Sequence, residues 1–458
     1  MAHGDRQTVL MEGVFSRDLV MSFDTESLTS DGGMTLVAAA DRALGLTEAL
    51  GGAILDRRQG GKIAHDSAGL LRQRILGLVA GYADCNDSSR LGDDPLWRRL
   101  KGDRRGEARP LASQPTLSRF ENRVTSRDLV RMGRVLRDTV IARARQRYGK
   151  EPVRRILIDL DPTCDPAHGR QQLIEFNAYY GTWCYLPMCA FLTFDGHPEN
   201  HLVAALLRSG ECRDFDGAIA LLRRLVPALR EAFPKTQLVV RLDAGFGNDE
   251  ILTWIEEQGL QYVVSLSRTR TLEDTVELFD LMQAARQAAF ATGESARGFG
   301  EIEHLAHAWD MPRRVIVKGE VVCLEGREAR DNPRFVATNM RGKPEDLYAL
   351  YVGRGEIENR IKELKHGLQL DRTSCPRFFA NQLRVLLTAA AYVLMQELRL
   401  AAAGTSCERA QVDTLRIRLL KIGARVVESV RRLVLHGPLA YPWLDDFRVI
   451  ARRLVAHL

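Results

Sequence analysis

The spacing of apolar positions divides the chain into a helical first part and a mixed middle part. Residues 66–83 carry apolar side chains three and four positions apart, which predicts a helix. A short helix is expected to open at Pro115, because proline is accepted in a first helical turn. Thr125 or Ser126 is expected to cap a further helix. Residues 1–150 are therefore predicted to be mostly helical.

Beyond residue 153 the pattern changes to short apolar runs bounded by turn residues. These runs predict strands at 154–161, 173–180, 184–194, 237–243 and 260–266. Amphipathic spacing predicts two intervening helices, at 215–233 and 249–258. Gly181 separates the second and third strands as a hairpin turn. Three antiparallel strands followed by helix, strand, helix and strand are the order of an RNase-H-like α/β domain.

Residues 267–345 interrupt this pattern. A polar helix is expected at 270–290, followed by the glycine- and serine-containing segment GESARGFGE. Strand-like pieces follow at 303–309, 313–324 and 334–338. The region is predicted to be a β-rich insertion in the α/β domain.

The segment 348–365 contains no proline and has apolar residues at helical spacing, which predicts a helix. At about 100° per residue, four polar side chains share one narrow face: Tyr351, Arg354, Glu358 and Lys365. Two other acids fall on the opposite side: Glu356 and Glu363. One carboxylate beside a tyrosine, an arginine and a lysine has the chemistry for holding a metal ion and phosphate oxygens together. The alternative is a solvent-exposed face of salt bridges, which is common on charged helices.

The spacing Y-x2-R-x3-E-x6-K in this helix resembles the YREK signature of bacterial insertion-sequence DDE transposases. Further segments, in the same order along the chain, resemble the insertion-sequence group numbered 1380: LIDLDPTCDPAHG (157–169), FNAYYG (176–181), RLDAGFG (241–247), RGEIENRIKELKHGLQLDRTSC (354–375) and NQLRVLLTAAAYVL (381–394). The resemblance covers roughly residues 155–400. It implies an RNase-H-like catalytic fold, with the β-rich insertion placed between the second aspartate and the glutamate helix.

Three acids stand where such a fold places its catalytic and metal-binding carboxylates. Asp161 ends the first predicted strand, Asp243 ends the fourth, and Glu358 lies on the late helix. Cutting DNA requires an activated nucleophile and charge relief at phosphorus, which two divalent ions about 3.5–4 Å apart supply. Few protein carboxylates suffice for magnesium, which keeps several waters. The expected cofactor is therefore Mg²⁺ or Mn²⁺, with two ions per active site.

The first acid has an alternative. Asp159 and Asp161 are two residues apart, so both point to the same side of a strand. Asp161 is favoured because its D-P-T context matches the D-x-T form of the resembled enzymes and lies at the strand end. Asp159 would then serve as a supporting carboxylate.

Several other residues are candidates for contacts with DNA. The resemblance implies that Arg354 and Lys365 grip phosphates and that Tyr351 hydrogen-bonds a phosphate oxygen or stacks near the strand terminus. Trp309 is either a base-stacking residue or, as we favour, a half-buried aromatic of a small β domain. His168 is interpreted as structural, because a neutral histidine is a poor magnesium ligand.

Positive charge is concentrated in two segments. The net charge is +6, but residues 97–137 carry +8 and residues 401–458 carry +5, which leaves −7 for the remainder. This distribution suggests a polyanionic partner. Arginines recur every three or four residues in the first segment, at Arg119, Arg123, Arg127, Arg131 and Arg134. They indicate either a helix–turn–helix-like DNA reader or an ordinary solvent-exposed basic face.

At 458 residues the chain is expected to form two or three domains. We predict a DNA-end-binding region at 1–150, a catalytic domain at 151–266 with 346–400, the insertion at 267–345, and a basic helical tail at 401–458. The eight cysteines show no C-x2-C pair, which favours a reduced, cytoplasmic protein and argues against zinc. There is no signal-like start, and the longest apolar run, 385–395, is predicted to be a buried helix.

The expected function is that of a transposase. It would bind the terminal inverted repeats of an insertion sequence, cleave the DNA ends and join the 3′-hydroxyl ends to target DNA, as a homodimer on DNA. The alternatives are an RNase-H-like nuclease or resolvase, and a domesticated DNA-binding protein that does not cut.

Overall fold

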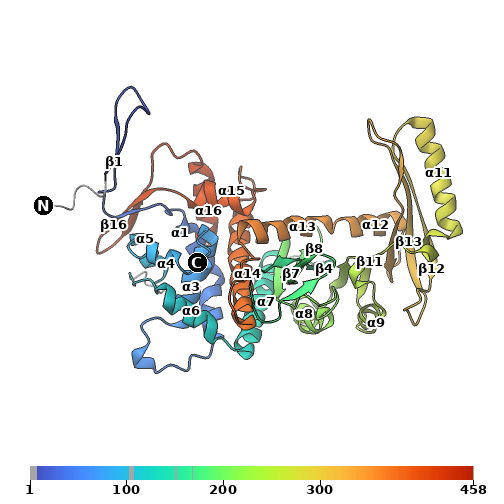
Figure 1. Ribbon diagram of the computed structural model, residues 1–458, viewed down its shortest axis with the longest axis horizontal. Coiled ribbons are helices and arrows are strands. Elements are labelled where there is room, and N and C mark those ends of the chain that lie inside the picture. Colours follow the sequence, from blue (N-terminus) through green and yellow to red (C-terminus); the bar gives the residue numbers. More distant parts are fainter. Residues whose placement is uncertain (1–7, 103–107, 150–151, 168, 457–458) are drawn as a thin grey trace.

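A computed structural model describes residues 8–102, 108–149, 152–167 and 169–456; His168 lies outside the described residues. The molecule is elongated (Figure 1), with the N-terminal helices at one end and a β-rich extension at the other. A central sheet connects them.

Helices form most of the N-terminal region. Thr125 caps the longest of them through a reciprocal pair of hydrogen bonds with Asp128, as the Thr125 alternative predicted. Asp66 caps an earlier helix by accepting a hydrogen bond of 2.6 Å from the Gly69 amide. The elements are β1 (Thr8–Met11), β2 (Leu19–Ser22), β3 (Leu28–Thr29), α1 (Met34–Leu44), α2 (Leu46–Gly52), a 3₁₀ turn (Gly60–Lys62), α3 (Ser67–Ala80), α4 (Asp87–Arg90), α5 (Pro95–Leu100), α6 (Gln114–Arg123) and α7 (Ser126–Tyr148).

The central sheet has a mixed core in the order β9-β8-β4-β10-β11. Strands β9, β8 and β4 pair antiparallel, whereas β4, β10 and β11 run parallel. The parallel pairing brings the carboxyl ends of β4 and β10 to the same edge of the sheet. The elements are β4 (Arg155–Pro162), β8 (Met188–Phe194), β9 (Asn200–Leu206), α8 (Ala218–Ala232), β10 (Gln237–Leu242), a 3₁₀ turn (Ala244–Phe246), α9 (Asp249–Glu257) and β11 (Gln261–Leu266).

The third antiparallel strand is not the one that the sequence predicted. Residues 173–180 form part of a separate small sheet of β5 (Asp165–Pro166), β7 (Thr182–Tyr185) and β6 (Glu175–Asn177). The third strand of the central sheet is instead β9. Its sequence NHLVAAL begins with two polar residues and alternates poorly, so its local pattern did not mark it as a strand.

The predicted insertion continues the central sheet. Strand β15 (Arg334–Thr338) pairs antiparallel with β11, and β13 (Arg313–Val322), β12 (Ala296–His304) and β14 (Arg330–Asp331) extend the sheet from there. Two helices precede these strands, α10 (Arg270–Glu273) and α11 (Val276–Thr292). Helix α11 packs so closely on β13 that a Cβ atom added at Gly319 would lie only 2.8 Å from the Leu281 Cβ.

The predicted helix 348–365 is a nearly straight rod along one face of the sheet (Figure 1). It consists of α12 (Pro344–Val352), α13 (Gly355–Lys362) and a π-helical turn (Glu363–Gly367). At the interruption, Arg241 Nη1 donates to the Leu350 carbonyl at 3.0 Å, and the Arg354 amide donates to the Tyr351 carbonyl at 2.9 Å instead of to the Leu350 carbonyl.

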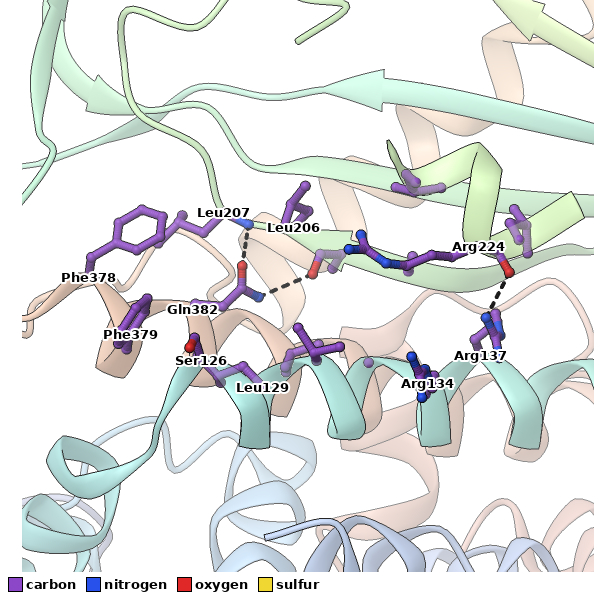
Figure 2. A pocket seen from close by; sticks show the side chains of 17 residues that line it. Ser126, Leu129, Arg134, Arg137, Leu206, Leu207, Arg224, Phe378, Phe379 and Gln382 are labelled. Carbon is purple, nitrogen blue, oxygen red and sulfur yellow. Dashed lines mark hydrogen bonds between the residues drawn. The ribbon is translucent and has the colours of Figure 1, made fainter. Parts of the chain in front are cut away.

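Helix α14 (Phe378–Ala401) joins the N-terminal helices to the sheet. It is long and apolar enough to cross a membrane, but 83% of its most apolar window is buried inside the protein. Gln382 accepts a hydrogen bond from the Leu207 amide and donates to the Ala205 carbonyl, as Figure 2 shows. An apolar cavity of about 260 Å³ lies beside this helix and is lined by α7, β9, α8 and α14. Arg137 of α7 also lines it and donates to the Arg224 carbonyl (Figure 2).

The C-terminal segment is not the helical tail that the sequence predicted. It contains α15 (Val412–Leu415), a π-helical turn (Arg416–Leu420), β16 (Ala424–Glu428), β17 (Leu433–His436) and α16 (Leu444–Val455). Strand β16 pairs with β3, and Lys421 Nζ lies 2.7 Å from Asp31 Oδ1. The segment therefore packs back onto the N-terminal region.

All eight cysteines are free thiols.

Candidate active site

Two aspartates meet at the carboxyl edge of β4 and β10. Asp161 is the penultimate residue of β4, and Asp243 directly follows β10, where its side chain accepts a hydrogen bond of 3.0 Å from the Gly245 amide. Arg354, at the break between α12 and α13, bridges them. Its Nη2 atom donates to Asp161 Oδ1 at 2.7 Å and to Asp243 Oδ2 at 3.2 Å.

The environment of this site raises the pKa of both aspartates. Burial raises the pKa of Asp161 to about 7, and repulsion from Asp243, Glu358 and Asp159 adds to the shift, while Arg354 opposes it. Burial also raises the pKa of Asp243. When both carboxylates are ionised, the one arginine between them neutralises only one of the two negative charges.

Glu358 stands apart from this pair. It lies exposed on α13, close enough for its charge to act on Asp161. Among the residues that the structure describes, no three carboxylate, imidazole or thiolate groups are gathered closely enough to ligate one metal ion. The structure thus brings Asp161 and Asp243 together but leaves the third predicted acid at the rim.

Asp159 has a different environment from Asp161. It is fully buried and forms a two-pronged ion pair with Arg241 on β10, at 2.8 Å to Nε and 2.7 Å to Nη2. Arg241 in turn donates to the Leu350 carbonyl of α12. Asp159 is therefore committed to fixing the glutamate helix on the sheet, which corresponds to the supporting role considered for it.

The other three residues of the helix motif have distinct surroundings. Arg354 Nε is buried without a hydrogen-bond partner among the described residues. Lys365 Nζ donates to the Cys164 carbonyl at 2.7 Å, three residues beyond Asp161. Tyr351 is half-buried, with its ring centroid 6.3 Å from that of Tyr348. Arg354 thus retains an unused donor at the site, and Lys365 is tied to its edge.

Trp309 is buried, with 6% of its surface exposed. Its Nε1 atom donates to the Gly247 carbonyl at 3.2 Å, and the Arg313 guanidinium lies 5.1 Å from the ring centroid. Arg313 is itself paired with Asp249 and Glu256. The favoured interpretation of Trp309 as a packed aromatic fits this environment.

The arginine-rich stretch does not form one continuous basic face. The turn at residues 124–125 divides it between α6 and α7. Arg119 and Arg127 are exposed. Arg123 is half-buried, with Nη2 3.5 Å from Asp56 Oδ2 and 3.4 Å from Ser67 Oγ. Of Arg119, Arg123 and Arg127, two are exposed and one is engaged inside the protein.

A fourth acid near the site was not anticipated. A Cβ atom at Gly245 would lie 2.0 Å from Asp214 Oδ2, and the charge of Asp214 contributes to the raised pKa of Asp243. Asp214 lies in the loop before α8, where the sequence CRDFDG offers two acids and no periodic signal distinguishes one from the other. Gly245 is the feature of the sequence that could have indicated this contact, since a side chain at position 245 would collide with Asp214.

The family to which the chain belongs is given by its match to a family model. The model described as transposase DDE domain group 1 matches residues 11–457. The chain belongs to this family of DDE transposases. A comparison with curated proteins finds no matching relative. Membership implies a nuclease or transposase that acts on DNA, and such enzymes generally use divalent metal ions.

The donor set of this DDE transposase suits such ions. Asp161 and Asp243 offer hard oxygen ligands, which magnesium and manganese prefer. Burial and, to a smaller extent, repulsion from neighbouring acids raise the pKa of Asp161, and a divalent cation beside its carboxylate would oppose both effects. The residues present therefore fit the group that the family implies.

Proposed function

We propose that this protein is a transposase of an insertion sequence of the group numbered 1380. It binds the terminal inverted repeats, cleaves the DNA ends and joins the resulting 3′-hydroxyl ends to target DNA. One observation carries the proposal: Arg354 bridges Asp161 and Asp243 at adjacent strand ends, at the start of the helix that bears Glu358.

The proposed catalytic domain is RNase-H-like. The strand order β9-β8-β4-β10-β11, with three antiparallel strands and two further parallel ones, supports it. Its ligand site lies outside the carboxyl ends of β4 and β10, where open α/β sheets bind their ligands. The domain comprises residues 151–266 and 346–400, and the strands of 267–345 extend its sheet.

Asp161, Asp243 and Glu358 are the proposed ligands of two Mg²⁺ or Mn²⁺ ions. When bound, these ions supply charge relief at phosphorus and a deprotonated nucleophile. The chain's own cations hold the DNA backbone. Arg354 places its guanidinium charge beside both aspartates, where a phosphate would approach, and Lys365 places a point charge beside the strand that carries Asp161. Tyr351 lies near enough to Arg354 for its charge to act on the guanidinium, and its proposed role is to hydrogen-bond a phosphate oxygen or to stack near the strand terminus.

Recognition of the transposon ends is assigned to the helical N-terminal region. Arg119 and Arg127 supply exposed charge on α6 and α7, and Arg123 fixes α6 to the loop at Asp56. The basic C-terminal segment packs on the same region through β16 and β3, so both basic segments lie at one end of the molecule (Figure 1). Two DNA ends must be held together, so the active form is a homodimer on DNA.

Cleavage of a DNA end by matched variants tests the proposal. Glu358→Gln should abolish metal-dependent cleavage while binding to the inverted repeat persists, because glutamine keeps the shape but not the charge. Glu356→Gln is the control, since Glu356 is an exposed acid two residues away that the proposal gives no ligand role. Equal loss of cleavage in both variants would contradict the assignment.

Strand transfer separates the proposal from its alternatives. A pre-cut end with a free 3′-hydroxyl should be joined to target DNA by the wild type. Cleavage without joining would indicate a nuclease or resolvase. Binding without either reaction would indicate a domesticated DNA-binding protein.

A further inference from the structure

Four aromatic side chains are exposed on the β6–β7 hairpin. The exposed fractions are 50% for Phe176, 89% for Tyr179, 40% for Tyr180 and 56% for Trp183. Large exposed rings give up the free energy that burial would supply, about 25 cal/mol per Å² of apolar surface. A cluster of them on a short hairpin therefore points to a binding surface.

The rings form two pairs. Phe176 and Trp183 face each other across the hairpin, with centroids 6.0 Å apart at an angle of 66°. Tyr179 and Tyr180 in the turn are 4.9 Å apart at 89°. Such edge-to-face pairs leave ring faces open for a further planar group.

The hairpin is firmly held. Asn177 Nδ2 donates to the Gly210 carbonyl at 2.8 Å, and its Oδ1 accepts from the amides of Tyr179 and Tyr180. Gly181 completes the turn with a φ of +62°, a conformation that favours glycine. The rings therefore extend from a preorganised support, which lowers the entropic cost of binding.

The hairpin also lies beside the carboxylates. Strand β7 pairs with β5, which begins four residues after Asp161. Burial raises the pKa of Tyr180 to about 12, and the charges of Asp214 and Asp161 contribute to the shift. Lys365 is bonded to the carbonyl of Cys164, between Asp161 and β5. The aromatic surface and the proposed phosphate-binding cations thus border one site.

We propose that Phe176, Tyr179 and Trp183 stack on unpaired bases of the DNA end whose backbone enters the carboxylate site. The inference rests on the proposed function. A DNA strand at this position presents phosphates to Arg354 and Lys365 and, on its other side, bases that flat rings can cover. Stacking on aromatic rings tolerates any base, because every base has a π face. Trp309 is buried and does not compete for this role.

The test compares two DNA ends that differ only in pairing. One end is fully paired, and the other carries three mismatched, unpaired terminal bases. The wild type should bind the unpaired end more tightly. Trp183→Ala and Tyr179→Ala should each weaken that binding about tenfold, while Trp183→Phe should retain most of it. The salt dependence of binding should be unchanged, because the rings carry no charge.

Phe290→Ala is the matched control. Phe290 is 95% exposed on α11, beyond β12 and β13 at the far end of the molecule (Figure 1). It should bind both ends as the wild type does. DNA ends that contain 5-iodouracil at the unpaired positions should, on irradiation, become cross-linked to the hairpin peptide 175–185 of the wild type.

The outcomes separate this inference from the proposed function. If the wild type cleaves its ends and the hairpin variants bind and cleave unchanged, the stacking role is wrong and the transposase assignment stands. If the hairpin variants lose only self-association, the surface contacts protein, and the stacking role is again wrong. If the wild type prefers unpaired ends through these rings but never cleaves, the stacking role holds and the transposase assignment fails.

Discussion

The Nη2 atom of Arg354 lies 2.7 Å from Asp161 Oδ1. The same atom contacts Asp243 Oδ2 at 3.2 Å, so one guanidinium group holds together two carboxylates from adjacent strands. A divalent cation bound by these carboxylates would compete with the guanidinium for the same oxygens. Arg354 is thus both the structural counter-ion of the two aspartates and a proposed contact to DNA phosphate.

Replacing Arg354 with alanine should destabilise the protein in a pH-dependent way. At pH 8 the buried Asp161 and the half-buried Asp243 would lose their partner, at a cost of about 3–5 kcal/mol. The pKa of Asp161, about 7, is above its ordinary value of 3.8. The folded protein therefore holds this proton more tightly than the unfolded chain, and stability falls as pH rises between about 4 and 7. Below pH 5 the cost of the substitution should be smaller.

Urea unfolding at pH 5 and pH 8 measures this difference, with Arg119→Ala as an exposed control. Added Mn²⁺ should raise the melting temperature of Arg354→Ala more than that of the wild type, because no guanidinium competes for the carboxylates. The Mn²⁺ effect should grow with pH, since metal and proton compete for Asp161. A pH-independent cost would contradict this account of the site.

Glu363→Gln should lower stability and should not serve as a neutral control for Glu358. The helical phase places Glu363 away from the site, but its carboxylate is buried among Arg360, Arg399 and the Val412 amide. Breaking such a buried cluster costs about 3–5 kcal/mol. Chemical denaturation should show that loss, whereas Glu356→Gln should remain within about 0.5 kcal/mol of the wild type.

The exposed arginines should account for part of the salt dependence of DNA-end binding. Arg119→Ala and Arg127→Ala should each reduce the slope of log K against log salt by about 0.9 if each neutralises one phosphate. Arg123→Ala should change the slope less, because its guanidinium faces Asp56 and Ser67. Gel-shift titrations at several salt concentrations, with cognate and scrambled ends, provide the measurement. Equal slopes for all three variants and the wild type would move recognition to the C-terminal segment.

Trp309→Ala should act on stability and not on base stacking. Removing a buried tryptophan costs about 3–5 kcal/mol. At a temperature where the variant remains folded, its preference for unpaired over paired DNA ends should match that of the wild type. A selective loss of that preference would indicate that Trp309 does stack on unpaired bases.

Local features of the site could be predicted from the sequence because they depend on neighbouring residues. Apolar runs marked β4 and β10, and the acids at their ends, Asp161 and Asp243, follow from those runs. The cap at Thr125 follows from its spacing to Asp128. Helical phase placed Arg354 and Glu358 on one face; the structure pairs Arg354 with Asp161 and leaves Glu358 exposed, near enough for its charge to act on Asp161.

Only the tertiary structure decides which residues that are distant in sequence pair with one another. Asp159 and Asp161 have the same strand phase, and only the position of Arg241 across the sheet distinguishes them. Residues 173–180 have an apolar pattern like that of a sheet strand, yet they pair outside the central sheet as the aromatic hairpin. Periodicity fixes which face of an element is apolar. Which element covers that face, and which charge neutralises a buried acid, depends on contacts between residues separated by 80 or more positions.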